Sequence, residues 1–436
     1  MPVFLTTTDA DFETDFAALL SAKREDSPDV DHIVAGIIAD VRDRGDAAVI
    51  ELTEKFDRLK LTPETLAFTP EEIEAACAQV PAAEREALEL AAERIRAYHV
   101  RQMPEDHSWT DPEGATLGWR WTPVSAAGLY VPGGLASYPS SVLMNAIPAH
   151  VAGVERLEIC APTPDGKVNP LVLLAAKLSG VGTVYRIGGA QAIAAMAYGT
   201  ETINPVDKIT GPGNAFVAAA KRRVFGKVGI DMIAGPSEIL VIADRDNDPD
   251  WVAVDLLSQA EHDESAQSIL ITDDAAFGQA VAAAVEKRLE TLERRAIAGV
   301  SWRDFGAVIT VRDLDEAAAL SNRVAPEHLE LCVADPEALS EKITHAGAIF
   351  LGQWTPEAIG DYVGGPNHVL PTARSARFSS GLSVMDFVKR TTLAKMTPAA
   401  LRAIGPAAEC LAKSESLEAH GLSVRARLDR LNEGSE

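Results

Sequence analysis

The feature that most constrains the fold is a pattern that occurs four times between Gly128 and Val224. In each copy a short β-type run is followed by a helix rich in Ala and Leu, and glycines lie at the turns. The runs are Gly128–Val131, Arg156–Ala161, Thr183–Ile187 and Lys208–Thr210, and the helices lie near Ser141–Val151, Asn169–Leu178, Ala190–Tyr198 and Asn214–Arg223. Strands and helices that alternate at this spacing predict a parallel sheet covered on both faces.

A second series of strands and helices follows the first. Its strands are expected at Glu238–Ala243, Ile269–Ile271, Ala307–Val311, Glu330–Val333 and Ala348–Leu351, and its helices at Pro249–Glu261, Ala275–Arg295 and Leu314–Asn322. We therefore predict an α/β fold with two Rossmann-like parallel-sheet units. Helical residues 32–99 are expected to pack onto the second unit, which makes that unit discontinuous.

The remaining segments complete the expected organisation. Residues 1–30 are predicted to form an N-terminal arm, Pro104–Trp121 a hairpin-like stretch, and residues 384–436 a helical tail. The two α/β domains are then residues 128–236, and residues 31–127 together with 237–383. The region 353–383 is rich in Gly, Pro and Ser without periodicity, and long loops of that kind are often functional.

Composition excludes several classes of protein. The 436 residues carry 40 Lys and Arg against 64 Asp and Glu, a net charge of −24, which disfavours non-specific nucleic-acid binding. No apolar run is long enough for a membrane helix, and no signal peptide is evident, so we expect a cytoplasmic protein. The four cysteines, Cys77, Cys160, Cys332 and Cys410, are far apart and are interpreted as incidental thiols.

The usual nucleotide-binding and hydrolase motifs are absent, so any nucleotide site must be atypical. Glycine-rich turns nevertheless end three of the strand–helix repeats. These turns are Tyr130-Val131-Pro132-Gly133-Gly134, Gly188-Gly189-Ala190-Gln191 and Gly211-Pro212-Gly213-Asn214. Because each turn lies at a carboxyl end of a strand and before a helix N-terminus, a dinucleotide site fits here. The alternative is that these glycines only connect strands to helices.

Two pairs of side chains in the second unit have the composition of a catalytic or metal site. Gln259 and His262 lie about 60° apart around a helix and offer an oxygen and an imidazole nitrogen, which is half a metal site. A His favoured by the dipole at a helix C-terminus is the simpler interpretation. Glu327 and His328 are adjacent and offer two common general bases. A glutamate favoured by the dipole at a helix N-terminus explains Glu327 equally well.

Two further segments carry carboxylates and imidazoles. Asp361 and His368 lie among glycines in the long loop, where a site or ordinary turn chemistry can explain them. In the tail, Glu415 and His420 would lie about 140° apart on an ideal helix. One small site therefore takes both side chains only if the helix breaks between them or the ligand lies between their two directions.

In order along the chain, these segments resemble the histidinol dehydrogenase family over nearly the whole sequence. The matching motifs begin at Tyr130 (YVPGG), Ile187 (IGGAQAIAA), Gly211 (GPGNAF), Ala234 (AGPSE), Ser258 (SQAEHD), Ala325 (APEHLEL) and Gly360 (GDYVGGPNHVLPT). The resemblance implies the NAD-dependent oxidation of L-histidinol to L-histidine through an aldehyde. It also implies one Zn²⁺ per subunit, with manganese or cobalt left open in vitro.

The resemblance carries over to individual residues. The zinc ligands become Gln259, His262, Asp361 and His420, and the acid/base pair becomes Glu327 and His328. Contacts to NAD are expected from Tyr130, Gln191 and Asn214. Contacts to the substrate are expected from Ser237, His328, His368 and Glu415 together with the zinc ligands. The family further implies a homodimer with exchanged tails, so that Glu415 and His420 complete the site of the partner subunit.

Three alternatives remain at this point. A related dehydrogenase would act on another alcohol, such as a hydroxy-sulfonate, but Glu415 and the imidazole-facing positions match the histidinol family. A zinc hydrolase would use the same ligands around a bound water with Glu327 as base, and the glycine turns disfavour it. A binding module without catalysis has no reason to carry the whole set of acid/base and ligand residues.

Overall fold

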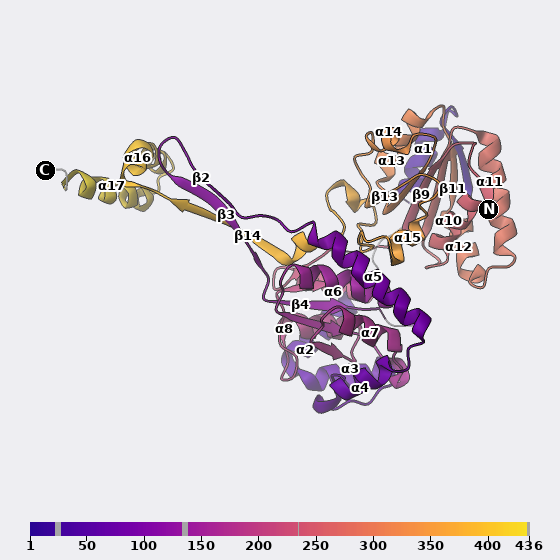
Figure 1. The fold of residues 1–436 in the computed structure, drawn as a ribbon, viewed down its shortest axis with the longest axis horizontal. Helices are drawn as coiled ribbons and strands as arrows, with labels where there is room; N and C mark the ends of the chain where they lie inside the picture. The colour runs from indigo at the N-terminus through magenta and orange to yellow at the C-terminus, as the bar shows by residue number, and fades with distance from the viewer. Residues whose placement is uncertain (22–27, 133–137, 234, 434–436) are drawn as a thin grey trace. The chain divides into compact units, whose positions relative to one another are not determined.

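The computed structural model describes residues 1–21, 28–132, 138–233 and 235–433, and it confirms the expected α/β class (Figure 1). Parts of three sequence features fall outside these residues: Asp26-Ser27 at the end of the arm, Gly133-Gly134 of the first glycine turn, and Ala234. The chain forms two compact units. The first comprises Met1–Gln102 and Ser125–Phe387, and the second comprises Met103–Val124 and Val388–Glu436.

The first unit contains two parallel sheets, of which the smaller has the strand order β6-β5-β4-β7-β8. The bounds are β4 (Ala126–Tyr130), β5 (Arg156–Cys160), β6 (Thr183–Tyr185), β7 (Lys208–Thr210) and β8 (Gly229–Ile230). Helices α6 (Pro139–Val151), α7 (Pro170–Leu178), α8 (Gly189–Tyr198) and α9 (Ala215–Val224) alternate with them. The fourfold pattern in the sequence therefore predicted four of these five strands, and it did not predict the short strand β8.

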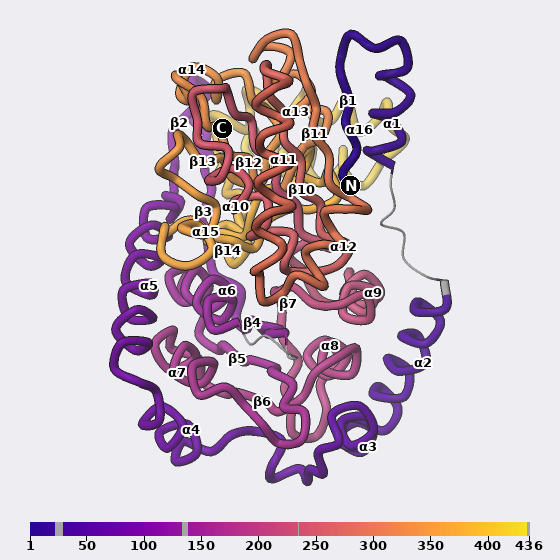
Figure 2. The backbone as a smooth tube through the Cα atoms, turned by 90° about the vertical axis from the view of Figure 1, so that its right-hand side faces the viewer, coloured from indigo at the N-terminus to yellow at the C-terminus, as the bar shows by residue number. Residues whose placement is uncertain are grey.

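The early helices pack on this smaller sheet, which corrects the expectation that they cover the second one. These helices are α2 (Pro28–Arg44), α3 (Asp46–Asp57), α4 (Pro70–Cys77) and α5 (Ala82–Val100). Figure 2 shows α2 beside α8 and α9, and Val34 and Val49 share one core with Tyr130. On the other side α4 contacts α7, and α5 contacts α6. Helical periodicity shows that each helix has an apolar face, but not which sheet that face meets.

The larger sheet has six parallel strands in the order β1-β11-β10-β9-β12-β13. Their bounds are β1 (Val3–Thr6), β9 (Glu238–Ala243), β10 (Gln267–Thr272), β11 (Ala307–Thr310), β12 (His328–Cys332) and β13 (Ala348–Leu351). Strands β9 and β10 are buried at every position. Such continuous burial is typical of a parallel strand covered on both faces.

Alternate residues of these strands enter two separate cores. Leu240 and Ile242 pack with α1 (Phe12–Ser21), α13 (Leu314–Val324) and α14 (Pro336–Ser340). Ile239 and Val241 pack with the helices of the opposite face. That face is covered by α10 (Pro249–Ala260), α11 (Ala275–Leu289) and α12 (Arg295–Phe305). The single helix expected over Ala275–Arg295 thus ends at Leu289, and a second helix follows.

The N-terminal residues are part of this larger sheet, so the expectation of a separate arm is wrong for the described residues 1–21. Strand β1 pairs in parallel with β11, with Val3 opposite Ala307. Phe12 and Phe16 of α1 are buried in the core of the same sheet. This pairing joins segments about 300 residues apart, and no local sequence pattern predicts it.

The second unit is an antiparallel ribbon followed by two helices. Strands β2 (His107–Thr110) and β3 (Thr116–Pro123) form the hairpin that was expected, and β14 (Val388–Lys395) pairs along the whole of β3. Residues 103–124 therefore group with the tail and not with the discontinuous domain. The tail begins with a strand and continues as α16 (Pro398–Ser414) and α17 (Glu418–Glu433). No helix within the described ranges is long and apolar enough to span a bilayer.

Candidate active site

The candidate active site lies at the amino ends of β9 and β12, which are neighbours in the larger sheet. Glu238 is the first residue of β9, and Glu327 directly precedes β12. The Glu238 N–H donates to Oε2 of Glu327 at 2.9 Å, and the Glu327 N–H donates to Oε2 of Glu238 at 3.3 Å. Each carboxylate thus satisfies the first free backbone N–H of the neighbouring strand. Both side chains are buried.

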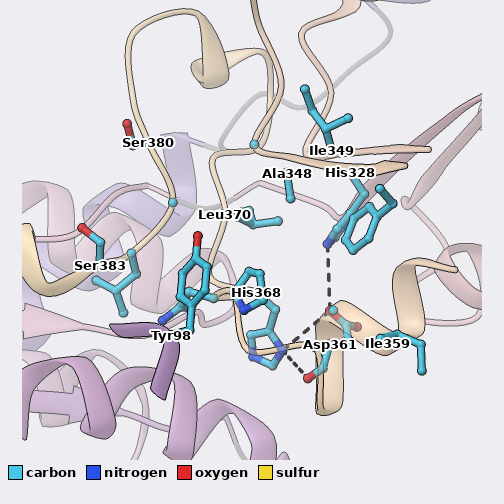
Figure 3. Close-up of a pocket in the computed structure, with 18 of the residues that line it drawn as sticks. Tyr98, His328, Ala348, Ile349, Ile359, Asp361, His368, Leu370, Ser380 and Ser383 are labelled. Atoms are coloured by element: carbon cyan, nitrogen blue, oxygen red, sulfur yellow. Dashed lines mark hydrogen bonds and ion pairs between the residues drawn. The ribbon is translucent and has the colours of Figure 1, made fainter. Parts of the chain in front are cut away.

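His328 is held in one orientation by the same pair of strands. Its Nδ1 lies 2.9 Å from the carbonyl oxygen of Glu238 and can only donate to it, so Nε2 carries no proton in the neutral ring. Nε2 is buried without a hydrogen-bond partner among the described residues. Burial, together with the nearby His262 and His368, lowers the pKa of His328 to about 3. His328 is therefore a neutral imidazole with a free basic nitrogen, which points toward Asp361 in Figure 3.

Helix α10 brings Gln259 and His262 to this edge of the sheet. His262 lies two residues beyond the end of this helix, and the two side chains meet as their spacing predicted, with Gln259 Nε2 2.8 Å from His262 Nδ1. Gln259 is fully buried, and its Oε1 has no partner among the described residues. Ser258 donates its hydroxyl to Glu357 at 3.2 Å, which ties this helix to the next element of the site.

The short helix α15 (Glu357–Tyr362) carries Glu357 and Asp361 one turn apart. Glu357 Oε1 lies 3.7 Å, and Asp361 Oδ1 3.9 Å, from His328 Nε2. His368 approaches from the following loop, with Nδ1 2.9 Å from the Asp361 carbonyl oxygen and Nε2 3.3 Å from Ser141 Oγ. His328, Asp361 and His368 line a pocket of about 690 Å³ (Figure 3).

The charges of this cluster fit a cation. Burial raises the pKa values of Glu357 and Asp361, and the charge of Asp361 raises the pKa of Glu357 further. His328, Glu357 and Asp361 present ligand atoms within 4.8 Å of one another. The unpartnered oxygen of Gln259 is a further neutral ligand. A divalent cation supplies the positive charge that these buried groups lack.

The glycine turns of the smaller sheet line a second pocket, of about 320 Å³. Tyr130, Gln191 and Asn214 all lie in its wall, at the carboxyl ends of β4, β6 and β7. The Gly189 N–H donates to the Tyr130 hydroxyl at 3.1 Å. Gly189 has a φ of 65°, and a Cβ there would lie 2.8 Å from Gln191 Oε1. The structure therefore brings together the three residues for which we expect NAD contacts.

The other expected site residues have different positions. Ser237 is half-buried and directly precedes β9, with its carbonyl oxygen accepting from the Gln267 N–H at 3.0 Å. Glu415 and His420 belong to the second unit, where both are exposed. The helix does break between them, because α16 ends at Ser414 and Ser416 has a φ of 60°. This is the first of the two geometries considered from the sequence.

Three carboxylates of the site were not singled out from the sequence. Glu357 has a recognisable signal, since Pro356 opens a helix that places it one turn before Asp361. Glu330 lies two residues after His328, hence on the same face of a strand that is otherwise apolar. Glu238 ends a matching motif, but its role depends on pairing with a strand about 90 residues away.

Fold and site together define an α/β enzyme that combines a buried cluster of carboxylates and imidazoles with a glycine-lined pocket on a second parallel sheet. The comparisons with known proteins agree with this class and narrow it. The chain belongs to the histidinol dehydrogenase family, whose profile matches residues 20–428.

Individual relatives cover the whole chain. It is 83% identical over 432 residues to the histidinol dehydrogenase of Ruegeria pomeroyi, covering 99% of this chain and 100% of that protein. It is 81% identical over 434 residues to that of Cereibacter sphaeroides, covering 100% of both. The crystal structure of histidinol dehydrogenase from Elizabethkingia anophelis superposes with a TM-score of 0.94 at 39% identity, covering 99% of each chain. The family resemblance seen in the sequence is thereby confirmed, and with it an oxidoreductase.

Proposed function

We propose that this chain catalyses the four-electron oxidation of L-histidinol to L-histidine through histidinal, the final step of histidine biosynthesis, with NAD as the hydride acceptor. The observation that carries the proposal is the unpartnered Nε2 of His328, a neutral base next to the buried carboxyl group of Glu327. Membership of the histidinol dehydrogenase family supports the substrate.

His328 is the base for the alcohol. An alcohol is too weakly acidic to lose its proton unaided at neutral pH, so a hydride leaves its carbon only as a base removes the hydroxyl proton. Nε2 of His328 accepts that proton, and the hydrogen bond from Nδ1 to the Glu238 carbonyl oxygen stabilises the resulting imidazolium. The nearby carboxyl groups of Glu357 and Asp361 stabilise the same positive charge.

Glu327 acts in the second oxidation. The aldehyde must add water before a second hydride can leave, and a carboxylate next to the reacting carbon activates that water. Burial and the neighbouring Glu238 raise the pKa of Glu327 well above its ordinary value, which makes it a stronger base once it is ionised. As water adds, Glu327 takes a proton from it and the His328 imidazolium returns its proton to the aldehyde oxygen. Neutral His328 then accepts the hydroxyl proton of the hydrate as the second hydride leaves.

We assign the metal ligands to Gln259, His262, Asp361 and His420, in a site for one Zn²⁺ per subunit. Two observations support this assignment for the part of the site that lies in the first unit. The Gln259 oxygen has no hydrogen-bond partner among the described residues, and ligand atoms of His328, Glu357 and Asp361 lie within 4.8 Å of one another. When bound, zinc would hold the substrate's amine and imidazole nitrogens and neutralise the carboxylates, without any redox step of its own. Ser237, His368 and Glu415 are assigned to substrate binding.

The second pocket and the tail complete the proposal. Tyr130, Gln191 and Asn214 are assigned to NAD. Asn214 Oδ1 accepts two N–H groups at the start of α9, so its amide N–H remains for a ligand. We further propose a homodimer with exchanged tails, in which Glu415 and His420 come from the partner subunit. Residues 128–236 remain our assignment for the NAD-binding domain.

Two variants test the division of labour between Glu327 and His328. Glu327→Gln should oxidise histidinol to the aldehyde but lose histidinal oxidation by about 10²–10⁴-fold, the usual contribution of a general base. His328→Asn should impair both stages to a similar degree. The measurements are NADH absorbance with histidinol or histidinal as substrate, and histidine formation.

Failure of these assays has a clear meaning. If the wild-type protein forms no NADH with histidinol, the proposed function is excluded. The alternatives to test are then a hydrolase activity and the oxidation of another alcohol. Normal histidinal oxidation by Glu327→Gln refutes the role of Glu327 alone.

A further inference from the structure

Asp57, the last residue of α3, is an acidic side chain in an unfavourable place. A carboxylate at a helix C-terminus meets the negative end of the helix dipole. The side chain is also half-buried, and its Oδ2 is buried without any hydrogen-bond partner among the described residues. The adjacent Arg58 does not satisfy it, because its guanidinium forms two hydrogen bonds to Asp165, at 2.7 and 2.6 Å.

This carboxylate lines the 320 Å³ pocket of the glycine turns, and it is the one charged side chain among the described residues that do so. The same pocket is lined by Tyr130, Gln191 and Asn214, the residues assigned to NAD. Apolar side chains flank Asp57. Phe56 and Phe216 also line the pocket and remain 46% and 37% exposed.

The position of the 320 Å³ pocket indicates which end of a dinucleotide it binds. The nicotinamide ring must reach the reacting carbon next to His328, in the 690 Å³ pocket. The two pockets share no lining residue. The pocket of Asp57 therefore suits the adenosine end, with exposed aromatic rings for a flat base and a carboxylate for the hydroxyls of its ribose.

We propose that Asp57 binds the hydroxyl groups of the adenosine ribose of NAD and makes the site reject the 2′-phosphate of NADP. This inference rests on the proposed use of NAD. A carboxylate accepts hydrogen bonds from both hydroxyls of a ribose, and it repels a phosphate placed at the 2′ position. Since Arg58 is held by Asp165, it is not free to offset that repulsion.

The test measures binding of NAD, NADP and the adenosine-2′-deoxy analogue of NAD to the purified full-length protein by calorimetry. Asp57→Asn should weaken NAD about 10- to 100-fold, the range of one or two hydrogen bonds to a charged group. The variant should also lose most of the wild-type preference for NAD over NADP. Wild type should bind NAD more tightly than the deoxy analogue, and Asp57→Asn should hardly distinguish them.

Stability separates this role from a structural one. Burial raises the pKa of Asp57, so the ionised side chain destabilises the folded state above that pKa, and this penalty disappears once the carboxyl group is protonated at low pH. Asp57→Asn should therefore raise the melting temperature at neutral pH while it weakens NAD binding. Glu54→Gln is the matched control, since it removes a charge from an exposed side chain of the same helix and should leave affinity unchanged.

Two outcomes overturn the proposal. One is an Asp57→Asn variant with wild-type affinity for NAD. The other is a variant that loses stability and still discriminates NAD from NADP as wild type does. Wild-type protein that binds NAD but does not oxidise histidinol would refute the proposed function and leave the binding test of Asp57 intact.

Discussion

At the scale of residues, the main feature is the pairing of Glu238 and Glu327 at the first positions of two adjacent strands. Each carboxylate accepts an N–H from the opposite strand, and Glu238 Oε1 also accepts from the Ala373 N–H at 2.8 Å. Glu238 therefore has backbone partners on both carboxylate oxygens. Its charge, together with burial, raises the pKa of Glu327.

This arrangement predicts a pH dependence for the aldehyde stage. A carboxyl group with a raised pKa is protonated below that pKa and becomes a base only as the pH rises above it. The acidic limb of kcat/KM for histidinal should thus lie above the ordinary pKa range of a glutamate. Glu238→Gln removes the neighbouring charge and keeps the acceptor for Ala373, so the limb should move to lower pH.

The measurement is the pH profile of histidinal oxidation for both proteins. Glu316→Gln serves as a control, because Glu316 lies on α13 and pairs with Arg312, outside the candidate active site. An unchanged limb in Glu238→Gln would show that Glu238 does not set the basicity of Glu327.

At the scale of elements, Glu330 connects the three segments that carry the site. It lies on β12 with His328, and its Oε1 accepts the N–H of Glu357, the first residue of α15, at 2.6 Å. It also interacts with Asp255, which lies one turn before Gln259 on α10 and whose charge raises the pKa of Glu330. Burial raises the pKa of both Glu330 and Asp255, which allows one proton to be shared between them.

We predict that the connection that Glu330 makes between β12, α10 and α15 depends on hydrogen bonding and not on charge. Glu330→Gln keeps an acceptor for Glu357 and offers an amide N–H to Asp255, so its stability and activity should stay close to wild type. Glu330→Leu leaves the buried Glu357 N–H without its acceptor, which lowers the free energy of unfolding by about 1–3 kcal/mol. It also removes the hydrogen bond that holds the start of α15, the helix that carries Asp361. Its melting temperature and its affinity for zinc should both fall, as measured by thermal unfolding and by titration with a zinc chelator. Equal behaviour of the Gln and Leu variants would contradict the link.

The elements also show how far a sequence alone can lead. Glu238–Ala243 and Ala348–Leu351 were predicted at their observed limits, because apolar runs between turn residues specify buried strands directly. The face that a helix buries against is not encoded locally, so α2–α5 were assigned to the wrong sheet. Strand β1 was missed for a similar reason, since its partner β11 lies far along the chain.

The same limit applies to the site. The rule that ligands bind at the carboxyl ends of parallel strands anticipated the pocket of Tyr130, Gln191 and Asn214. It does not anticipate Glu327 and His328, which lie at the amino ends of β9 and β12. Those residues were singled out as an adjacent Glu–His pair, and the family resemblance then implied their acid/base role. Glu357 was overlooked although it shares a helix with Asp361.

At the scale of the whole molecule, the second unit has little core of its own. The helices α16 and α17 pack against each other and bury few side chains. Apolar side chains remain exposed on these helices and on the turn between them: Ile404 (40%), Leu411 (63%), Leu417 (42%) and Leu422 (57%). Exposed apolar side chains gathered on one segment are typical of a contact surface, and a second copy of the chain is the occupant that the proposed dimer supplies.

Mixed dimers test whether the tail acts in the partner subunit. Subunits with His420→Ala have a defective tail, and subunits with Glu327→Gln have a defective first unit. If tails are exchanged, a dimer of one subunit of each kind has one intact site and one site with both defects. Such dimers, purified through two different affinity tags, should oxidise histidinal at about half the wild-type rate per dimer, whereas each homodimer is nearly inactive. A tail that serves its own subunit leaves both sites of the mixed dimer defective, so a mixed dimer as inactive as the homodimers would refute the exchange.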